Sequence, residues 1–172
     1  MSKREKGFSL IELLIVVAII LIIAAIAIPN MIRSRMAANE ASAVGSIRTM
    51  TTASITFNST YGDGFPPSLG VLGGTGPVNC QNAELLDTVV ASGQKSGYNF
   101  ALVPGLVAVT TVPAGCAAGF SDGYVVTATP ITLGTTGQRA FCSDASGVIF
   151  FNPTGAVAPA SPNCLTSDSP LQ

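Results

Sequence analysis

One apolar segment constrains this sequence more than any other feature. Residues 8–28 contain a single charged side chain, Glu12, and residues 13–28 are all apolar. As an α-helix with a rise of about 1.5 Å per residue, the segment extends roughly 32 Å, which matches the hydrocarbon core of a bilayer. Unpaired backbone groups are costly in lipid, so we expect residues 8–28 to form a membrane-spanning helix.

Charged residues before the apolar segment predict its orientation. Lys3, Arg4 and Lys6 crowd the first seven residues, whereas basic residues are sparse in the rest of the chain. Basic flanks tend to remain in the cytoplasm, so the chain after Ile28 is expected outside it. Pro29 follows the apolar run and removes one helical hydrogen bond, which predicts a kink or a locally loosened helix there.

A helical pattern resumes after this proline. Between residues 31 and 57, apolar positions recur at three- and four-residue steps, as Val44, Ile47, Thr51 and Ile55. The charged residues of the segment lie largely off this stripe: Arg33, Arg35, Glu40 and Arg48. We therefore predict one helix over residues 8–57, with an amphipathic second half that packs on a domain.

Residues 58–172 differ from the N-terminal segment in composition and pattern, and they predict a globular domain. Residues 61–77 hold six glycines and three prolines, which predicts a long loop. A short helix is expected next, capped by Asn82 and stopped by Gly93. Strand-like runs follow at residues 98–103, 106–112, 124–131, 138–142 and 148–151. They predict an antiparallel sheet of about four strands, a hairpin turn with a left-handed residue at 143–147, and a C-terminal loop after residue 151. The expected fold class is α+β: a long helix packed on a small antiparallel sheet.

Four cysteines lie in the C-terminal half, at positions 80, 116, 142 and 164. None has the two-residue spacing of a zinc or thioredoxin-like motif. An even number in an exported domain predicts two disulfides, with buried free thiols as the alternative. Of the three possible pairings, we take Cys80 with Cys116 and Cys142 with Cys164.

The composition argues against catalysis and against direct nucleic-acid binding. The chain has no histidine, which excludes Ser-His-Asp and Cys-His sites, and its formal net charge of -1 offers no basic field for DNA. Asp122, Asp144 and Asp168 lack a ligand-dense pattern, so turn formation is preferred to a Ca²⁺ site. The triplet at residues 58–60 matches a glycosylation signal, which matters only if it is exposed. No enzyme activity, cofactor or metal is expected.

The strongest motif lies at the N-terminus, where residues 7–20 read GFSLIELLIVVAII. A short basic leader ends at Gly7, Phe8 follows directly, Glu12 is the fifth residue after this junction, and Pro29 lies just past the apolar run. This combination closely resembles the processing site and N-terminal helix of type IV pilins and type II secretion pseudopilins. The resemblance covers about residues 1–57 and is only architectural beyond them.

The resemblance implies a processing route and a set of partners. A prepilin peptidase is expected to remove residues 1–7 between Gly7 and Phe8, after which Phe8 is N-methylated. The product would stay in the inner membrane as a single-pass protein with a cytoplasmic N-terminus until assembly machinery extracts it from the lipid. It would then join copies of itself in an extracellular filament that serves adhesion or motility, with Glu12 and Pro29 involved in assembly.

Three functions remain open at this point. The first is a pilus subunit, favoured by the disulfide-like C-terminal region; the second is a pseudopilin of a type II secretion system; the third is a signal-anchored or secreted binding domain that never polymerises. An ordinary signal peptide would be cut after residues 25–27, which read Ala-Ile-Ala. Glu12 opposes that reading, because a carboxylate costs about 2.5–3.5 kcal/mol at mid-membrane and is rare there without a partner.

Overall fold

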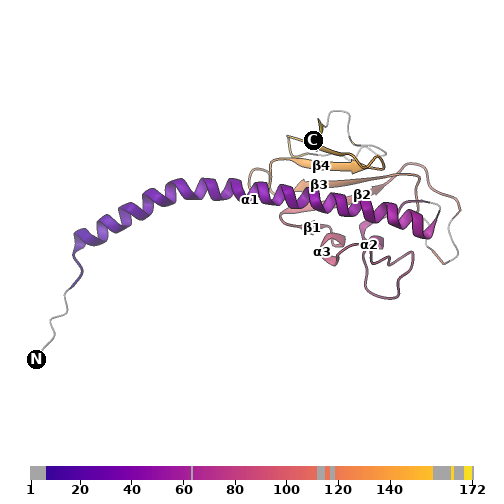
Figure 1. Cartoon of the computed structure of the whole chain (residues 1–172), viewed down its shortest axis with the longest axis horizontal. Helices are drawn as coiled ribbons and strands as arrows, with labels where there is room; N and C mark the ends of the chain where they lie inside the picture. The colour runs from indigo at the N-terminus through magenta and orange to yellow at the C-terminus, as the bar shows by residue number, and fades with distance from the viewer. Residues whose placement is uncertain are drawn as a thin grey trace, which may run out of the picture. The chain divides into compact units, whose positions relative to one another are not determined.

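The computed structural model describes residues 7–62, 64–111, 115–116, 119–156, 164 and 169–171. These residues form three helices and six strands (Figure 1): α1 (Leu10–Tyr61), α2 (Leu69–Leu72), α3 (Thr88–Ala91), β1 (Gln94–Lys95), β2 (Tyr98–Pro104), β3 (Tyr124–Pro130), β4 (Ala140–Asp144), β5 (Ile149–Asn152) and β6 (Ser169–Pro170). The chain divides into two compact units, Met1–Arg35 and Met36–Gln172, and α1 contributes to both.

Helix α1 ends because a glycine follows it. Gly62 adopts a left-handed backbone with φ of 67°, and its N–H donates to the carbonyl of Asn58 at 3.0 Å. This bond satisfies one of the last carbonyls of the helix. The end at Tyr61 lies one turn beyond the predicted residue 57, and Pro29 lies inside α1 without ending it.

The sheet is a meander in which neighbours along the chain are neighbours in space. Its order is β1-β2-β3-β4-β5-β6, and every pair is antiparallel. The expected α+β class, a long helix on an antiparallel sheet, is confirmed. The sheet has six strands rather than about four, because β1 and β6 are edge strands of two residues each, too short for a sequence pattern.

Some local predictions were wrong. Residues 106–111 form no strand, and only Ala108 makes an isolated bridge, with Ser121; Val112 lies outside the described residues. Leu106 is 76% exposed, so its apolar character reflects no packing against a neighbour. The short helix expected after Asn82 is only the four-residue α3, and its N-cap is Asp87, whose side chain accepts from the Val89 N–H at 3.1 Å. The predicted loop at residues 61–77 contains α2.

The core lies between the second half of α1 and one face of the sheet (Figure 1). Strand β2 shows the expected alternation, and its side chains at positions 98, 100 and 102 enter the core. The predicted apolar stripe of α1 was partly wrong: Ile47 and Thr51 are buried, but Ile55 is 49% exposed. The observed buried face follows steps of three and four residues: Glu40, Ala43, Ile47, Met50, Ser54 and Phe57.

Two disulfides tie loops to this core. Cys80 pairs with Cys116, with their Cα atoms 5.6 Å apart, and Cys142 of β4 pairs with Cys164, with their Cα atoms 6.0 Å apart. These are the pairs chosen from the three possible pairings. The turn between β4 and β5 contains a left-handed Gly147, with φ of 75°, as predicted for residues 143–147.

Candidate assembly site

The expected cleavage point lies in exposed, non-helical backbone. Gly7, Phe8 and Ser9 precede α1 and adopt no regular structure, and the Phe8 residue is 81% exposed. The Leu13 N–H donates to the Ser9 carbonyl at 3.2 Å, which is the first hydrogen bond of the helix and makes Ser9 its N-cap. The bond between Gly7 and Phe8 therefore stands just outside the helix, where no helical hydrogen bond restrains it.

Glu12 holds the start of this helix in place. Its carboxylate accepts a hydrogen bond from the backbone N–H of Ser9 at 2.9 Å. A serine at the N-cap with a glutamate three residues later is the sequence of a capping box, and this bond is one of its two halves. A negative charge in the first turn is also favoured by the helix dipole. The serine three residues before Glu12 was the sequence signal for this bond, and sequence analysis did not use it.

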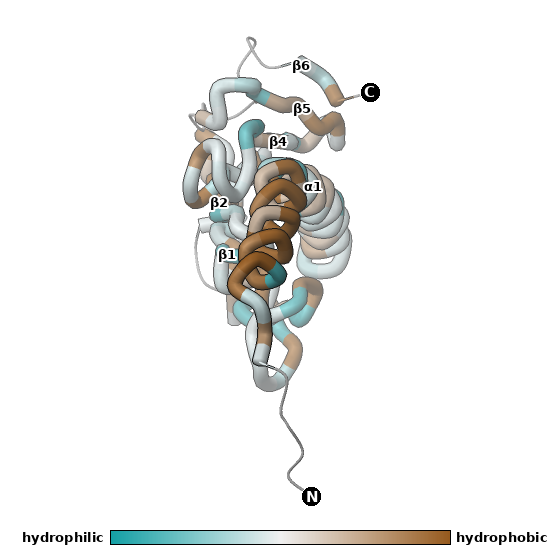
Figure 2. The backbone as a smooth tube through the Cα atoms, turned by 90° about the vertical axis from the view of Figure 1, so that its left-hand side faces the viewer, coloured by the Kyte–Doolittle hydropathy of each residue, from teal (hydrophilic) through white to brown (hydrophobic). Residues whose placement is uncertain are grey.

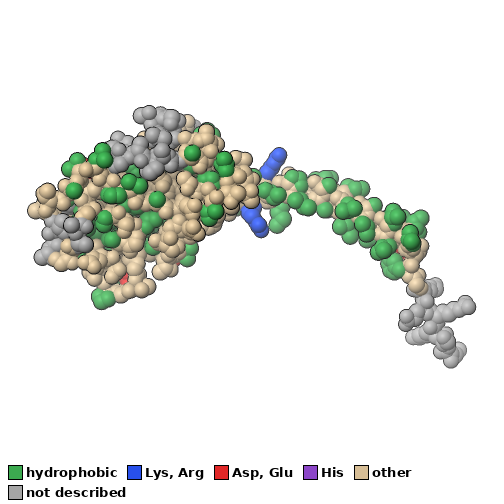
Figure 3. Space-filling view, turned by 180° about the vertical axis from the view of Figure 1, so that it is seen from behind, with side chains coloured by type: hydrophobic (Ala, Val, Ile, Leu, Met, Phe, Trp, Pro, Cys, Tyr) green, Lys and Arg blue, Asp and Glu red, His purple; other side chains and the backbone are tan. Residues whose placement is uncertain are grey.

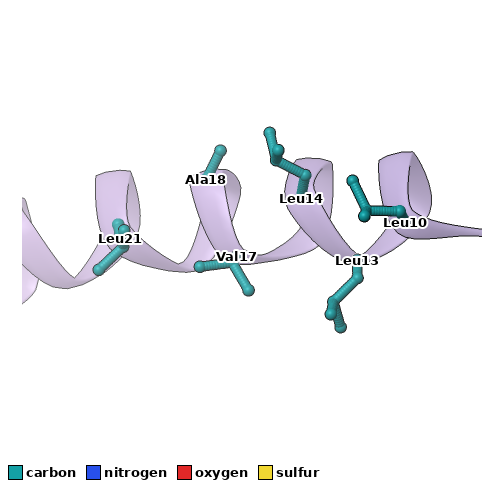
Figure 4. A pocket seen from close by; sticks show the side chains of 6 residues that line it. All are labelled: Leu10, Leu13, Leu14, Val17, Ala18 and Leu21. Carbon is teal, nitrogen blue, oxygen red and sulfur yellow. The ribbon is translucent and has the colours of Figure 1, made fainter.

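Large apolar side chains surround the first half of α1 and stay exposed. Those between residues 10 and 28 are 45% to 80% exposed, and they form the long brown stretch of the helix in Figure 2. Six apolar residues line a shallow groove along this helix (Figure 4): Leu10, Leu13, Leu14, Val17, Ala18 and Leu21. By length and composition, α1 is the one helix in the described part of the chain that can cross a membrane.

The carboxylate of Glu40 holds the second half of α1 to the sheet, although the sequence pattern placed this residue off the packing stripe. Glu40 is 8% exposed. One of its oxygens, Oε1, accepts from the backbone N–H groups of Gln138 at 2.9 Å and Arg139 at 3.2 Å. The other, Oε2, accepts from Nε of Arg139 at 2.8 Å and from its Nη2 at 2.7 Å. A carboxylate with four donors explains why a charged residue can lie at a buried position.

This ion pair sits within a wider set of contacts. The guanidinium of Arg139 lies over two rings, 5.6 Å from the centroid of Phe141 and 5.5 Å from that of Phe151. The Tyr98 hydroxyl donates to the Arg139 carbonyl at 2.8 Å. Burial alone would raise the pKa of Glu40, but the N–H of Gln138 and the Arg139 side chain stabilise the carboxylate, and its pKa falls below the ordinary value.

Other residues singled out from the sequence serve the fold. Asp144 is buried and accepts from the backbone N–H groups of Ser146 and Cys164. Asp168 lies outside the described residues. Within the parts of the chain that are described, no three His, Cys, Asp or Glu side chains gather where a metal ion could bind. Asn58 of the glycosylation triplet is half-buried, and its side chain accepts from the Gly64 N–H at 3.0 Å.

The second half of the long helix packs on an antiparallel sheet, and its first half presents exposed apolar side chains; together these features define a pilin-like fold. Residues 2–28 carry the prokaryotic N-terminal methylation motif. This match places Gly7, Phe8 and Glu12 within a recognised prepilin signature.

Two type IV pilus proteins are similar to part of this chain. The type IV major pilin protein PilA of Myxococcus xanthus is 44% identical over 77 residues, 40% of this chain and 35% of the relative. The type IV wide pilus major component PilA4 of Thermus thermophilus is 58% identical over 38 residues, 22% of this chain and 29% of the relative. The similarity thus spans about a third of each relative's length. No solved structure matches the chain.

Proposed function

We propose that this chain is a pilin, a structural subunit that polymerises into a type IV pilus for adhesion or motility. The observation that carries the proposal is the exposed apolar surface of α1 between residues 10 and 28. Contiguous apolar surface of this extent marks a site of contact with a membrane or with other protein chains. A pilin meets both demands in turn: lipid covers the helix before assembly, and the helices of neighbouring subunits cover it in the filament.

Processing at the N-terminus prepares the subunit for this exchange. We propose that a prepilin peptidase cuts between Gly7 and Phe8 and that Phe8 is then N-methylated. The methylation motif over residues 2–28 and the exposed, non-helical backbone at residues 7–9 support this step. The cut removes the basic leader but leaves the apolar helix attached, whereas an ordinary signal peptidase would remove that helix.

Glu12 would then set the register between subunits. After cleavage, the new amine of Phe8 lies four residues from Glu12, and both groups lie at the edge of an apolar segment. The carboxylate already accepts the Ser9 N–H, which lowers the cost of keeping it in a single subunit. The amine of an incoming subunit offers a stronger, charge-assisted partner. Pairing at this point would fix the axial stagger, which apolar packing alone specifies poorly.

The proposal includes a location and a set of partners. The subunit would wait in the inner membrane with its N-terminus in the cytoplasm, and inner-membrane pilus machinery would extract it into the filament. The motif and the apolar helix fit membrane anchoring and pilus assembly. A pilus is preferred to a secretion pseudopilus because both relatives are named as major pilus components.

Electron microscopy of the cell surface tests this function. Cells that lack the gene should lose surface filaments, and complementation with the intact gene should restore them. A label on the protein should decorate those filaments along their length. Secretion that fails in the deletion strain while surface filaments persist would assign the chain to a pseudopilus. Unchanged filaments and unchanged secretion would refute assembly as its role.

A further inference from the structure

Two arginines follow the apolar segment closely along α1. Arg33 and Arg35 are exposed, and neither takes part in an ion pair or side-chain hydrogen bond among the described residues. No acidic residue stands three or four positions from either of them along α1, where a helical ion pair would form. Figure 3 shows basic side chains that project to two sides of the helix, next to its apolar surface.

The spacing of the two arginines sets their direction. At 3.6 residues per turn, positions two residues apart differ by about 200° around the axis. Arg33 and Arg35 therefore point to nearly opposite sides of α1. Any rotation of α1 about its own axis leaves one guanidinium on each side of the helix. We call this pair of arginines the cationic collar.

This collar lies at the outer edge of the polar layer of a membrane. Arg33 lies five residues past Ile28, or about 7.5 Å along a helix, and Arg35 lies about 10 Å past it. The headgroup region on each side of the hydrocarbon core is roughly 5–7 Å thick. Long arginine side chains bend toward the interface, which brings both guanidiniums within reach of lipid phosphates. Met31 and Ile32 add exposed apolar surface between Ile28 and the collar.

We propose that Arg33 and Arg35 bind the phosphate groups of anionic lipids and so fix how deeply the subunit sits in the bilayer. Guanidinium groups suit this ligand because they donate two parallel hydrogen bonds to phosphate oxygens. The same contact holds the subunit against extraction, so assembly must break it. The inference rests on the membrane insertion proposed above, and it adds a lipid partner to that function.

Lipid-dependent fluorescence quenching tests the collar directly. The chain has no tryptophan, so Ile32→Trp introduces a single tryptophan beside the two arginines. The full-length variant is reconstituted in phosphatidylcholine vesicles, and brominated phosphatidylglycerol or brominated phosphatidylcholine is added as the quencher. The ratio of the two apparent binding constants measures the preference for the anionic lipid. Each arginine near a charged surface is expected to contribute up to about fivefold to that ratio.

Matched variants separate the collar from general charge. In the Ile32→Trp background, Arg33→Gln with Arg35→Gln should bring the ratio close to one. High salt should reduce the ratio in the parent protein, which here is Ile32→Trp with both arginines intact. Arg48→Gln is the control. Arg48 is also exposed on α1 but lies 20 residues past Ile28, which is about 30 Å along a helix. It should keep the full preference.

Other outcomes overturn the proposal in distinguishable ways. Equal quenching by both lipids in the parent protein, or a preference that survives loss of both arginines, would contradict the lipid-binding collar but leave membrane insertion intact. A preference lost equally in Arg48→Gln would show that net charge, rather than the collar, causes it. Quenching by neither lipid would mean that the helix does not insert, and would also defeat the proposed function.

Discussion

Replacing Glu40 with glutamine tests whether one carboxylate holds the second half of α1 against the sheet. The amide oxygen of glutamine can still accept from the backbone N–H groups of Gln138 and Arg139. Its NH₂ group, however, would face the Nε and Nη2 donors of Arg139, where Oε2 now accepts at 2.8 Å and 2.7 Å. Two charge-assisted hydrogen bonds are therefore lost, and two donors are set against each other.

The size of the loss follows from the exposure of the two partners. A hydrogen bond to a charged group contributes about 1.5–3 kcal/mol, and removing one partner of a buried ion pair costs about 3–5 kcal/mol. The Arg139 side chain is 42% exposed, so water can solvate it after the change. We therefore expect Glu40→Gln to lower the free energy of unfolding by about 2 kcal/mol, or the Tm by about 4–8 °C.

The effect should depend on pH with a definite sign. The pKa of Glu40 is lower in the folded state than its ordinary value of 4.5. Its ionised form thus stabilises the fold fully above pH 4.5, and this contribution disappears as the pH falls through the folded pKa. The stability gap between the parent and Glu40→Gln should be constant near neutral pH and should narrow below pH 4.5.

Chemical unfolding of the full-length protein in detergent micelles measures this gap. The tyrosine near-ultraviolet signal reports the globular unit, because Tyr98 and Tyr124 are fully buried. Arg48→Gln serves as the control for loss of an exposed charge and should change stability by less than about 0.5 kcal/mol. A Glu40→Gln variant as stable as the control, or a gap that does not change between pH 7 and acid, would refute the reasoning.

The remaining predictions concern assembly, the disulfide, the core and one tyrosine. Glu12→Val should insert and be processed normally yet build few filaments; filaments of normal number and length at normal subunit levels would rule out charge pairing. Cys142→Ser with Cys164→Ser should cost about 3 kcal/mol of unfolding free energy, and peptide mapping of exported protein should find the bridge between these two residues. Phe57→Ala should cost about 3–5 kcal/mol in the same unfolding assay, because Phe57 is fully buried. Burial raises the pKa of Tyr98, so spectrophotometric titration should show its phenol ionising only well above pH 10 or on unfolding.

Sequence periodicity predicted the helices and strands in which apolar positions recur at regular steps over several turns or strand residues. The apolar run and the steps that follow it fixed α1 to within one turn, although Gly62, read only as part of a loop, sets its end. Strands β2 to β5 were found because their apolar residues face a core. The run at residues 106–112 carries the same residue types, but Leu106 and Val107 are exposed, and composition cannot distinguish the two cases.

The polar contacts were harder to foresee because their partners lie far apart in the chain. Glu40 pairs with a residue 99 positions away, and helical periodicity alone marked it as a surface charge. The bond between Glu12 and Ser9 is local, and a capping-box pattern indicates it. Strands of two residues are too short to show an alternating pattern. The sequence therefore does not predict β1 and β6, which are recognised by their pairing with the neighbouring strands.

Intact-mass measurement of the protein in purified surface filaments tests the central claim most directly. Removal of seven residues from the 172-residue chain leaves 165. The account predicts a filament subunit of that length that begins with N-methyl-Phe8, carries both disulfides and retains the whole of α1. A mature chain that begins at Ile28 would show an ordinary signal peptide; it would lack the apolar helix and would contradict assembly through that helix.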